Sequence, residues 1–130
     1  MFSYVYRYAS GFLVVWTLLI FVLCAAPGRY IPSNSWLELL SLDKLVHASI
    51  FFILGALLLL RVYKLQQKAH WVFVYLIAAV SYGILLEVMQ ARFFSQRSYD
   101  PWDMMANSAG CLLALIFRGK LHKRFMTWAE

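Results

Sequence analysis

A short stretch at the start of a long apolar run carries three ionisable side chains of different kinds. Asp43, Lys44 and His47 supply a carboxylate, an ammonium and an imidazole, and the apolar run extends from Leu45 to Leu60. Ionisable groups inside an apolar segment are costly, so they usually face a protein interior or a wet cavity and mark a functional site. An imidazole also titrates near neutral pH and can transfer protons. This stretch is therefore the first candidate for chemistry.

Two later apolar segments also carry polar residues at helical spacing. Glu87 and Gln90 are three positions apart, and Asp103 and Asn107 are four apart. Residues at these spacings share one face of a helix, as His47 does with the carboxylate four positions before it. We expect three helices to bring these polar pairs to a similar depth in one bundle.

Three chemistries fit this set of residues. His47 and Glu87 could act as a general acid–base pair. Lys44 could hold a phosphate or carboxylate group together with Arg92 and Arg97, which belong to the polar connection after the third apolar run. The carboxylates and His47 could also bind a divalent cation. However, the chain has no HExxH or comparable spacing, so the sequence predicts neither a metal ion nor another cofactor.

Several of these residues also have a purely structural interpretation. Asp100 followed by Pro101 is typical of a helix N-cap and first helical position, and Asp103 suits the first turn. Asn107 could form a hydrogen bond between helices without any further role. Glu87 lies a turn inside its apolar segment, where an ionised carboxylate needs a partner, so a structural salt bridge is its alternative.

The composition indicates an integral membrane protein. Of its 130 residues, 63% are hydrophobic and 14% are charged, whereas soluble domains are about 45–50% apolar and about 25% charged. The length allows four spans with short connections but no second domain, so residues 1–130 are expected to form a single domain. The net charge of +6 comes from basic clusters that flank apolar runs, which indicates topology signals and anionic lipid rather than nucleic acid.

The hydropathy pattern predicts an all-α bundle of four transmembrane helices. Capping-box spacing at Ser35 and the apolar residues after it predict a short interfacial helix between the first and second spans. A cleaved signal peptide is the alternative for the first apolar run. The four spans are expected near residues 9–26, 44–60, 70–90 and 102–117.

Small residues inside the apolar runs are expected to have packing roles. Gly55, Gly83 and Gly110 predict close approach between helices. Cys24 and Cys111 have no metal-ligand spacing and are interpreted as small buried residues, with a disulfide between them as the alternative.

The distribution of basic residues predicts the orientation of the spans. Most of them lie in the N-terminal segment, in the loop after residue 60 and in the C-terminal tail, which would share one side of the membrane. By the positive-inside rule, both termini are then cytoplasmic. The polar residues at Asp43, Glu87 and Asp103 would open toward the opposite, extracytoplasmic side.

The order and spacing of the polar residues resemble the VanZ-like family of small bacterial membrane proteins. The resemblance covers residues 43–117, and the family takes its name from a protein associated with low-level teicoplanin resistance. It implies a bacterial inner membrane and cell-envelope setting, but it implies no defined reaction. The matching segments are Asp43–Lys44–x–x–His47, Tyr82–Gly83–x–x–x–Glu87–x–x–Gln90, and Arg97–Ser98–x–Asp100–x–x–Asp103–x–x–x–Asn107–x–x–Gly110.

Together, the residues and the resemblance predict an outward-facing polar pocket that binds an anionic envelope lipid or a lipid-linked cell-wall precursor. One alternative is a membrane-embedded enzyme that modifies or hydrolyses such a lipid through His47 and Glu87. A second is a structural subunit of a membrane complex. Four short helices leave little volume, so a homodimer or a membrane partner protein could complete the pocket. The expected ligand-binding residues are Asp43, Lys44, Gln90, Arg97, Asp100, Asp103 and Asn107.

Overall fold

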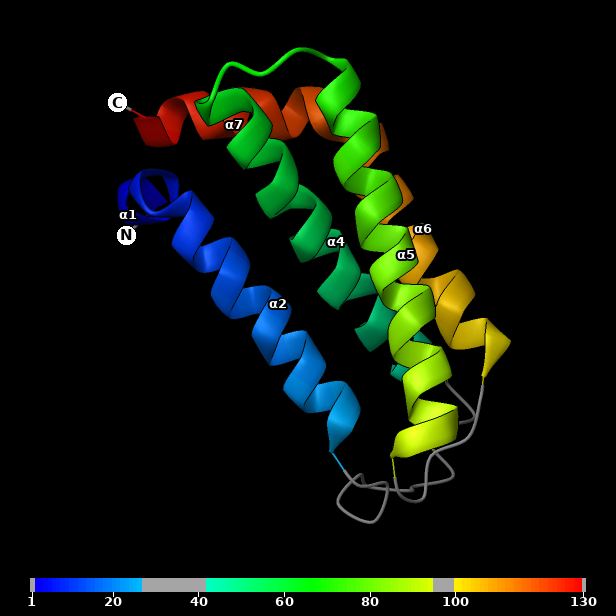
Figure 1. Cartoon of the computed structure of the whole chain (residues 1–130). Helices are drawn as coiled ribbons and strands as arrows, with labels where there is room; N and C mark the ends of the chain where they lie inside the picture. The colour runs from blue at the N-terminus through cyan, green and yellow to red at the C-terminus, as the bar shows by residue number, and fades with distance from the viewer. Residues whose placement is uncertain (1, 27–41, 95–99, 130) are drawn as a thin grey trace.

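A computed structural model describes residues 2–26, 42–94 and 100–129, and the described residues form helices without any strand (Figure 1). The all-α prediction is therefore confirmed for this part of the chain. The predicted interfacial helix falls within residues 27–41, outside the described residues. The helices are α1 (Phe2–Arg7), α2 (Ala9–Ala25), α4 (Leu42–Lys64), α5 (His70–Phe93), α6 (Pro101–Ile116) and α7 (Arg118–Ala129).

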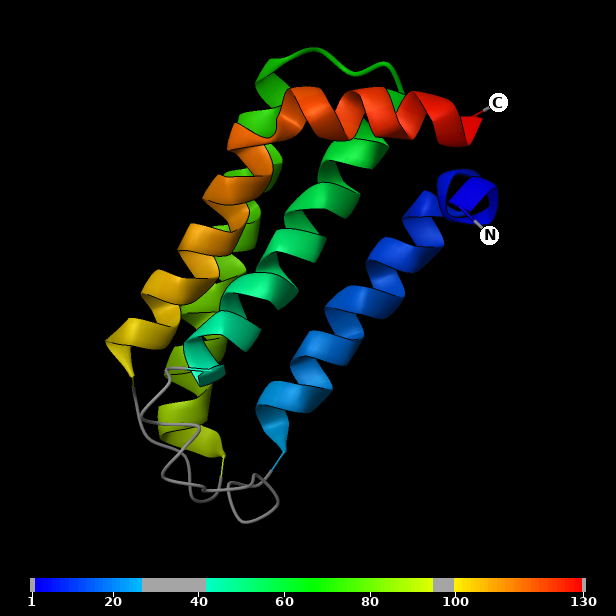
Figure 2. The ribbon, with the colours of Figure 1, turned by 180° about the vertical axis from the view of Figure 1, so that it is seen from behind.

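The four longest helices lie side by side and alternate in direction along the chain, while α1 and α7 lie at one end of the bundle (Figures 1 and 2). We call this the α7 end, and we call the opposite end, where α4 and α6 begin, the site end. Each long helix contributes a residue to one shared core. These core residues are at most 2% exposed and include Ile20, Phe51, Leu86 and Ala114.

The α7 end contains more helix than the sequence predicted. The second predicted span ended at residue 60, whereas α4 continues to Lys64 because Val62 is buried and Tyr63 packs against α7. The C-terminal tail, which the sequence distinguished only by its basic residues, forms the amphipathic helix α7. Its Phe125 is buried, and the His122 ring lies 4.4 Å from the Tyr63 ring. The apolar side of α7 thus covers the end of α4.

Two helices are long and apolar enough to cross a membrane, judged by length and composition alone: α4 over Asp43–Lys64 and α5 over His70–Phe93. The apolar helix α2 has 17 residues and α6 has 16. At a rise of about 1.5 Å per residue, these two are about 24–26 Å long, slightly less than the hydrocarbon thickness of about 30 Å. The structure therefore shows two candidate spans.

The helices α4 and α6 run parallel and their backbones touch. A Cβ added at Gly110 would lie 2.1 Å from the Ala48 carbonyl oxygen, and one at Gly55 would lie 2.8 Å from the Ala114 Cβ. At Gly83 on α5, an added Cβ would lie 3.1 Å from the Phe51 ring. The prediction that these glycines permit close helix approach is confirmed. This packing places the first turns of α4 and α6 next to each other.

We predict that Gly110→Ala destabilises the protein by at least about 1–3 kcal/mol, because the added methyl group must push one helix backbone away from the other. Gly11→Ala is the matched control, since nothing lies within 4 Å of a Cβ at that exposed position of α2. Alanine there should be neutral or stabilising by up to about 1 kcal/mol. Thermal unfolding of both variants in detergent, followed by circular dichroism, measures the difference. Equal melting of Gly110→Ala and the wild type would contradict the described helix contact.

Candidate functional site

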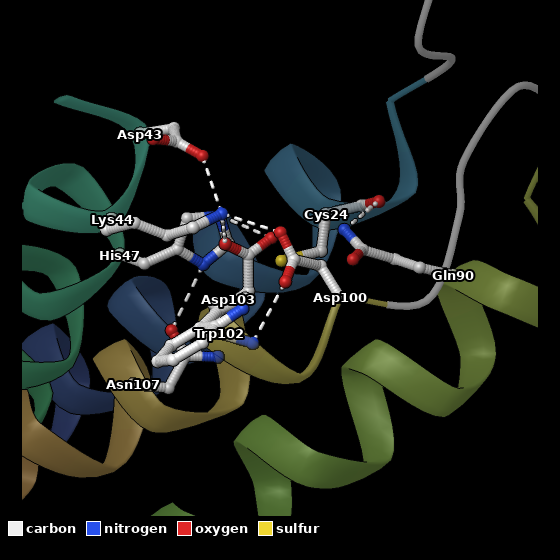
Figure 3. A network of polar contacts seen from close by, with 9 residues as sticks. All are labelled: Cys24, Asp43, Lys44, His47, Gln90, Asp100, Trp102, Asp103 and Asn107. Atoms are coloured by element: carbon white, nitrogen blue, oxygen red, sulfur yellow. Dashed lines mark hydrogen bonds and ion pairs between the residues drawn. The ribbon is translucent and has the colours of Figure 1, made fainter. Parts of the chain in front are cut away.

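The Lys44 ammonium lies at the centre of a cluster of carboxylates at the site end (Figure 3). Its Nζ is 2.7 Å from Asp43 Oδ2, 2.6 Å from Asp100 Oδ2 and 2.6 Å from Asp103 Oδ1. The Lys44 side chain is 28% exposed and that of Asp103 is 17% exposed. The cluster is therefore half-buried, and it joins the first turn of α4 to the start of α6.

Asp100 has two structural partners, one for each carboxylate oxygen. Its Oδ1 accepts a hydrogen bond from the Trp102 backbone N–H at 2.9 Å, and Pro101 occupies the first helical position of α6. The predicted N-cap is thus confirmed. Its Oδ2 accepts from Lys44, and this hydrogen bond holds the pKa of Asp100 below its ordinary value. The same residue therefore starts α6 and ties it to α4.

His47 is oriented by a buried amide. Its Nδ1 lies 3.1 Å from the Asn107 Oδ1, and Asn107 is 2% exposed. Because an amide oxygen can only accept, the Nδ1 carries the proton and donates it in this hydrogen bond. The other ring nitrogen, Nε2, then faces the Asp103 Oδ2 at 3.8 Å (Figure 3).

Glu87 brings a third helix, α5, to the same place. The residue is completely buried. One of its carboxylate oxygens, a ring nitrogen of His47 and a carboxylate oxygen of Asp103 all lie within 4.8 Å of one another. The structure thus brings three groups of the residues selected from the sequence to one end of the bundle. These are the selected residues of α4, those at the start of α6, and Glu87 of α5.

Gln90 is engaged differently from the other selected residues. Its side-chain amide donates to the Cys24 carbonyl oxygen at 3.0 Å, near the C-terminus of α2. About two turns before it on α5, the Tyr82 hydroxyl donates to the Thr17 carbonyl oxygen at 2.8 Å. Carbonyls in the last turn of a helix lack intrahelical partners, so Gln90 satisfies one of them and joins α5 to α2.

The cations predicted to hold an anionic head group are only partly described. Lys44 is surrounded by three carboxylates, Arg92 is exposed near the end of α5, and Arg97 lies outside the described residues. Every acidic residue that the structure describes lies in this region. Carboxylates therefore outnumber ammonium groups in the described part of the site. The acidic residues are Asp43, Glu87, Asp100 and Asp103.

The cysteines do not form the disulfide that the sequence left open. The thiol of Cys111 is buried in α6 and lies 3.9 Å from the Phe51 carbonyl oxygen of α4. Cys24 is half-buried near the end of α2. Their interpretation as small packing residues agrees with these positions.

An apolar groove of about 360 Å³ lies between α5 and α6. Its lining includes Phe73 and Ile77 of α5 and Leu112 of α6, with Ser108 as one of two polar contributors. Ser108 directly follows Asn107 in the chain, and the lining residues of α6 extend from Ser108 toward the α7 end. No residue pattern in the sequence predicts this groove, because ordinary apolar side chains form most of it.

Comparison with known proteins gives one informative match. The chain is similar to the uncharacterized protein C11E3.10 of the yeast Schizosaccharomyces pombe, with 32% identity over 99 residues. The match includes 76% of this chain and 55% of the relative, so the chain spans about half the length of the curated relative that it matches. No family model and no solved structure matches the chain. The VanZ-like resemblance stays a prediction, and a fungal relative gives no support to a bacterial setting.

We predict that Lys44→Met lowers the free energy of unfolding by about 1–3 kcal/mol at pH 7, because three carboxylates then face one another without the ammonium. The pH dependence of the free energy of unfolding should also change sign in this variant. In the wild type, the lowered pKa of Asp100 contributes stability above about pH 4, and that stability is lost as the pH falls through the folded-state pKa. In Lys44→Met, protonation of a crowded carboxylate should instead relieve repulsion.

Thermal unfolding of the wild type and Lys44→Met between about pH 7 and pH 3 measures this difference. Lys68→Met is the matched control, because Lys68 is exposed in the loop between α4 and α5 at the opposite end of the bundle. This control should follow the wild-type curve. Parallel pH curves for Lys44→Met and the wild type would show that the carboxylate cluster does not depend on Lys44.

Proposed function

We propose that this chain is an integral membrane protein that binds a membrane lipid, with the polar head group at the site end. One observation carries the proposal: the lining of an apolar groove on α6 begins at Ser108, one residue after the Asn107 that bonds to His47 in the polar site. A lipid needs this combination, because its head group is polar and its chains are apolar. The two halves of the ligand would therefore meet matching surfaces.

The exterior of the bundle supports its placement in lipid. Large apolar side chains are exposed on several helices, including Val15 of α2 at 63%, Ile77 of α5 at 67% and Ile116 of α6 at 65%. Soluble proteins rarely leave such extensive apolar surface in water. We therefore propose that α2 and α6 cross the membrane beside α4 and α5, as a four-span bundle whose shorter helices are matched by local thinning of the bilayer.

The groove would hold part of one acyl chain. From Ser108 to Leu115, its lining on α6 extends about 10 Å at 1.5 Å per residue. A head group near Asp103 would thus leave the chain to follow α6 toward Leu115, through the space lined by Leu112. An anionic lipid or a lipid-linked cell-wall precursor would require positive charge in addition to Lys44, because three carboxylates already surround that ammonium.

We predict that the gently solubilised protein retains a discrete lipid, identified by native mass spectrometry. Leu112→Trp should reduce its occupancy several-fold, because the larger ring fills the groove. Leu113→Trp is the matched control, since Leu113 is exposed and does not line the groove. The same mixture of bulk phospholipids on all three proteins would contradict the proposal.

A second candidate function is an enzyme that modifies or hydrolyses the bound lipid. The specific observation in its favour is the orientation of His47, whose Nε2 is held toward Asp103 by the Asn107 amide. The copurified lipid, returned to fresh protein, should then change mass, and His47→Gln should bind the lipid without changing it. An unchanged lipid mass would leave binding as the function.

The proposed orientation places the α7 end in the cytoplasm. Basic residues collect there, whereas all the described acidic residues lie at the site end. This asymmetry agrees with the positive-inside rule. The basic residues near the α7 end are Arg7, Arg61, Lys64, Lys68, Arg118, Lys120, Lys123 and Arg124.

We predict that an impermeant thiol reagent labels Ser33→Cys but not Gln66→Cys in intact cells, in a background that carries Cys24→Ala and Cys111→Ala. Gln66 is exposed in the turn between α4 and α5, whereas Ser33 belongs to the connection between α2 and α4 and lies outside the described residues. Labelling of both positions after permeabilisation is the control for reactivity. Labelling of Gln66→Cys alone in intact cells would invert the orientation and place the site in the cytoplasm.

A further inference from the structure

Three potential metal ligands from three different helices meet at the site end. His47 of α4, Glu87 of α5 and Asp103 of α6 each have one ligand atom within 4.8 Å of the other two. Glu87 is completely buried, and the side chains of His47 and Asp103 are 21% and 17% exposed. Ligand atoms that share one ion at bond lengths of about 2.0–2.2 Å lie roughly 3–4 Å apart. Small side-chain adjustments would therefore bring these atoms onto one ion.

The His47 ring is hydrogen-bonded in the way that is usual for a metal-binding histidine. Metal-binding histidines usually donate the N–H of the other ring nitrogen to an oxygen, which fixes the tautomer and aims the lone pair. Here Nδ1 donates to the buried Asn107 Oδ1 at 3.1 Å, which leaves Nε2 facing the carboxylates. The distance of 3.8 Å from Nε2 to Asp103 Oδ2 exceeds the usual N–H···O limit of about 3.2 Å. It matches the separation of two ligands on one ion.

Asp103 can serve Lys44 and an ion at the same time. Its Oδ1 accepts from the Lys44 ammonium at 2.6 Å, whereas its Oδ2 is the oxygen that faces His47. The residue would thus bind an ion through one oxygen while the other oxygen remains fixed. Lys44 would act as the outer partner that orients this ligand.

The local charge also favours a cation. The site end carries four described carboxylates, of which three surround Lys44 and the fourth is the buried Glu87. A divalent ion between His47, Glu87 and Asp103 would be attracted by the two carboxylates of this group, one of which is completely buried.

A second group of carboxylates, from Asp43, Asp100 and Asp103, is close enough to hold an ion but is a poorer candidate. The Lys44 Nζ already lies 2.6–2.7 Å from an oxygen of each of these residues. The ammonium therefore occupies the position that a cation would take. This comparison assigns any ion to the group that contains His47.

We propose that His47, Glu87 and Asp103 form a binding site for one divalent transition-metal ion of the zinc or manganese type. Calcium and magnesium prefer all-oxygen sites, whereas one imidazole nitrogen and two carboxylate oxygens suit zinc or manganese. Three protein ligands leave a coordination position open for water or for a phosphate oxygen. The inference goes beyond the proposed lipid binding and does not depend on it.

The test uses the full chain in detergent, stripped with a chelator, dialysed against zinc and analysed by inductively coupled plasma mass spectrometry. We expect about one zinc ion per wild-type chain. His47→Gln and Asp103→Asn should weaken zinc binding at least about tenfold. His70→Gln is the histidine control, since His70 is exposed at the start of α5 near the opposite end. Asp43→Asn, which changes only the group around Lys44, should retain the ion.

Two results would overturn the proposal. One is equal zinc content in the wild type and His47→Gln. The other is loss of zinc in Asp43→Asn with retention in His47→Gln, which would place the ion among the carboxylates around Lys44. Because no lipid is added, failure here leaves the lipid proposal to its own experiment.

A measurement on the wild type alone tests the proposal even if His47→Gln or Asp103→Asn does not fold. X-ray absorption at the zinc edge should show a shell of nitrogen and oxygen ligands with one imidazole. A sulfur ligand would instead indicate binding by Cys24 or Cys111 and would overturn the proposal, as would a shell without imidazole.

Discussion

The direct contact between the backbones of α4 and α6 is the constraint on which the site depends. Gly110 lies so close to the Ala48 carbonyl that no side chain fits between them, and the two helices run in the same direction. Their first turns therefore lie side by side at one end of the bundle. Lys44 and His47 reach Asp103 and its neighbours only because of this registration. A shift of one helix by a single turn would move the ammonium about 5.4 Å from its carboxylates.

Asp103 connects the two parts of the polar site. One of its oxygens accepts from Lys44, which belongs to an open and half-buried cluster, and the other faces His47 in the more buried part. Lys44 neutralises part of the negative charge and keeps the carboxylates ordered. His47, oriented by Asn107, can then present its other nitrogen to a ligand. The arrangement separates a structural ion-pair cluster from a position where chemistry or ion binding can occur.

The sequence predicted the four long helices, the N-cap at Asp100 and the close contact at Gly110, because each depends on residues that are near one another in the chain or on a single small residue. It did not predict that Gln90 would bond to α2, since the choice of a partner carbonyl depends on how the helices pack. The metal-binding motifs sought in the sequence also have a restricted scope. Motifs such as HExxH describe ligands on one helix, whereas His47 and Asp103 come from different helices and share no spacing in the sequence.

The long sequence separation within the Lys44 cluster has a consequence for biosynthesis. Lys44 bonds to residues 56 and 59 positions later, and His47 bonds to one 60 positions later. When α4 has just been made, Asp43 is therefore the carboxylate of this cluster that is already present. The partners emerge from the ribosome only with the start of α6, after α5 is complete. The contacts of Lys44 with Asp100 and Asp103, and of His47 with Asn107, therefore cannot form before the start of α6 has been made.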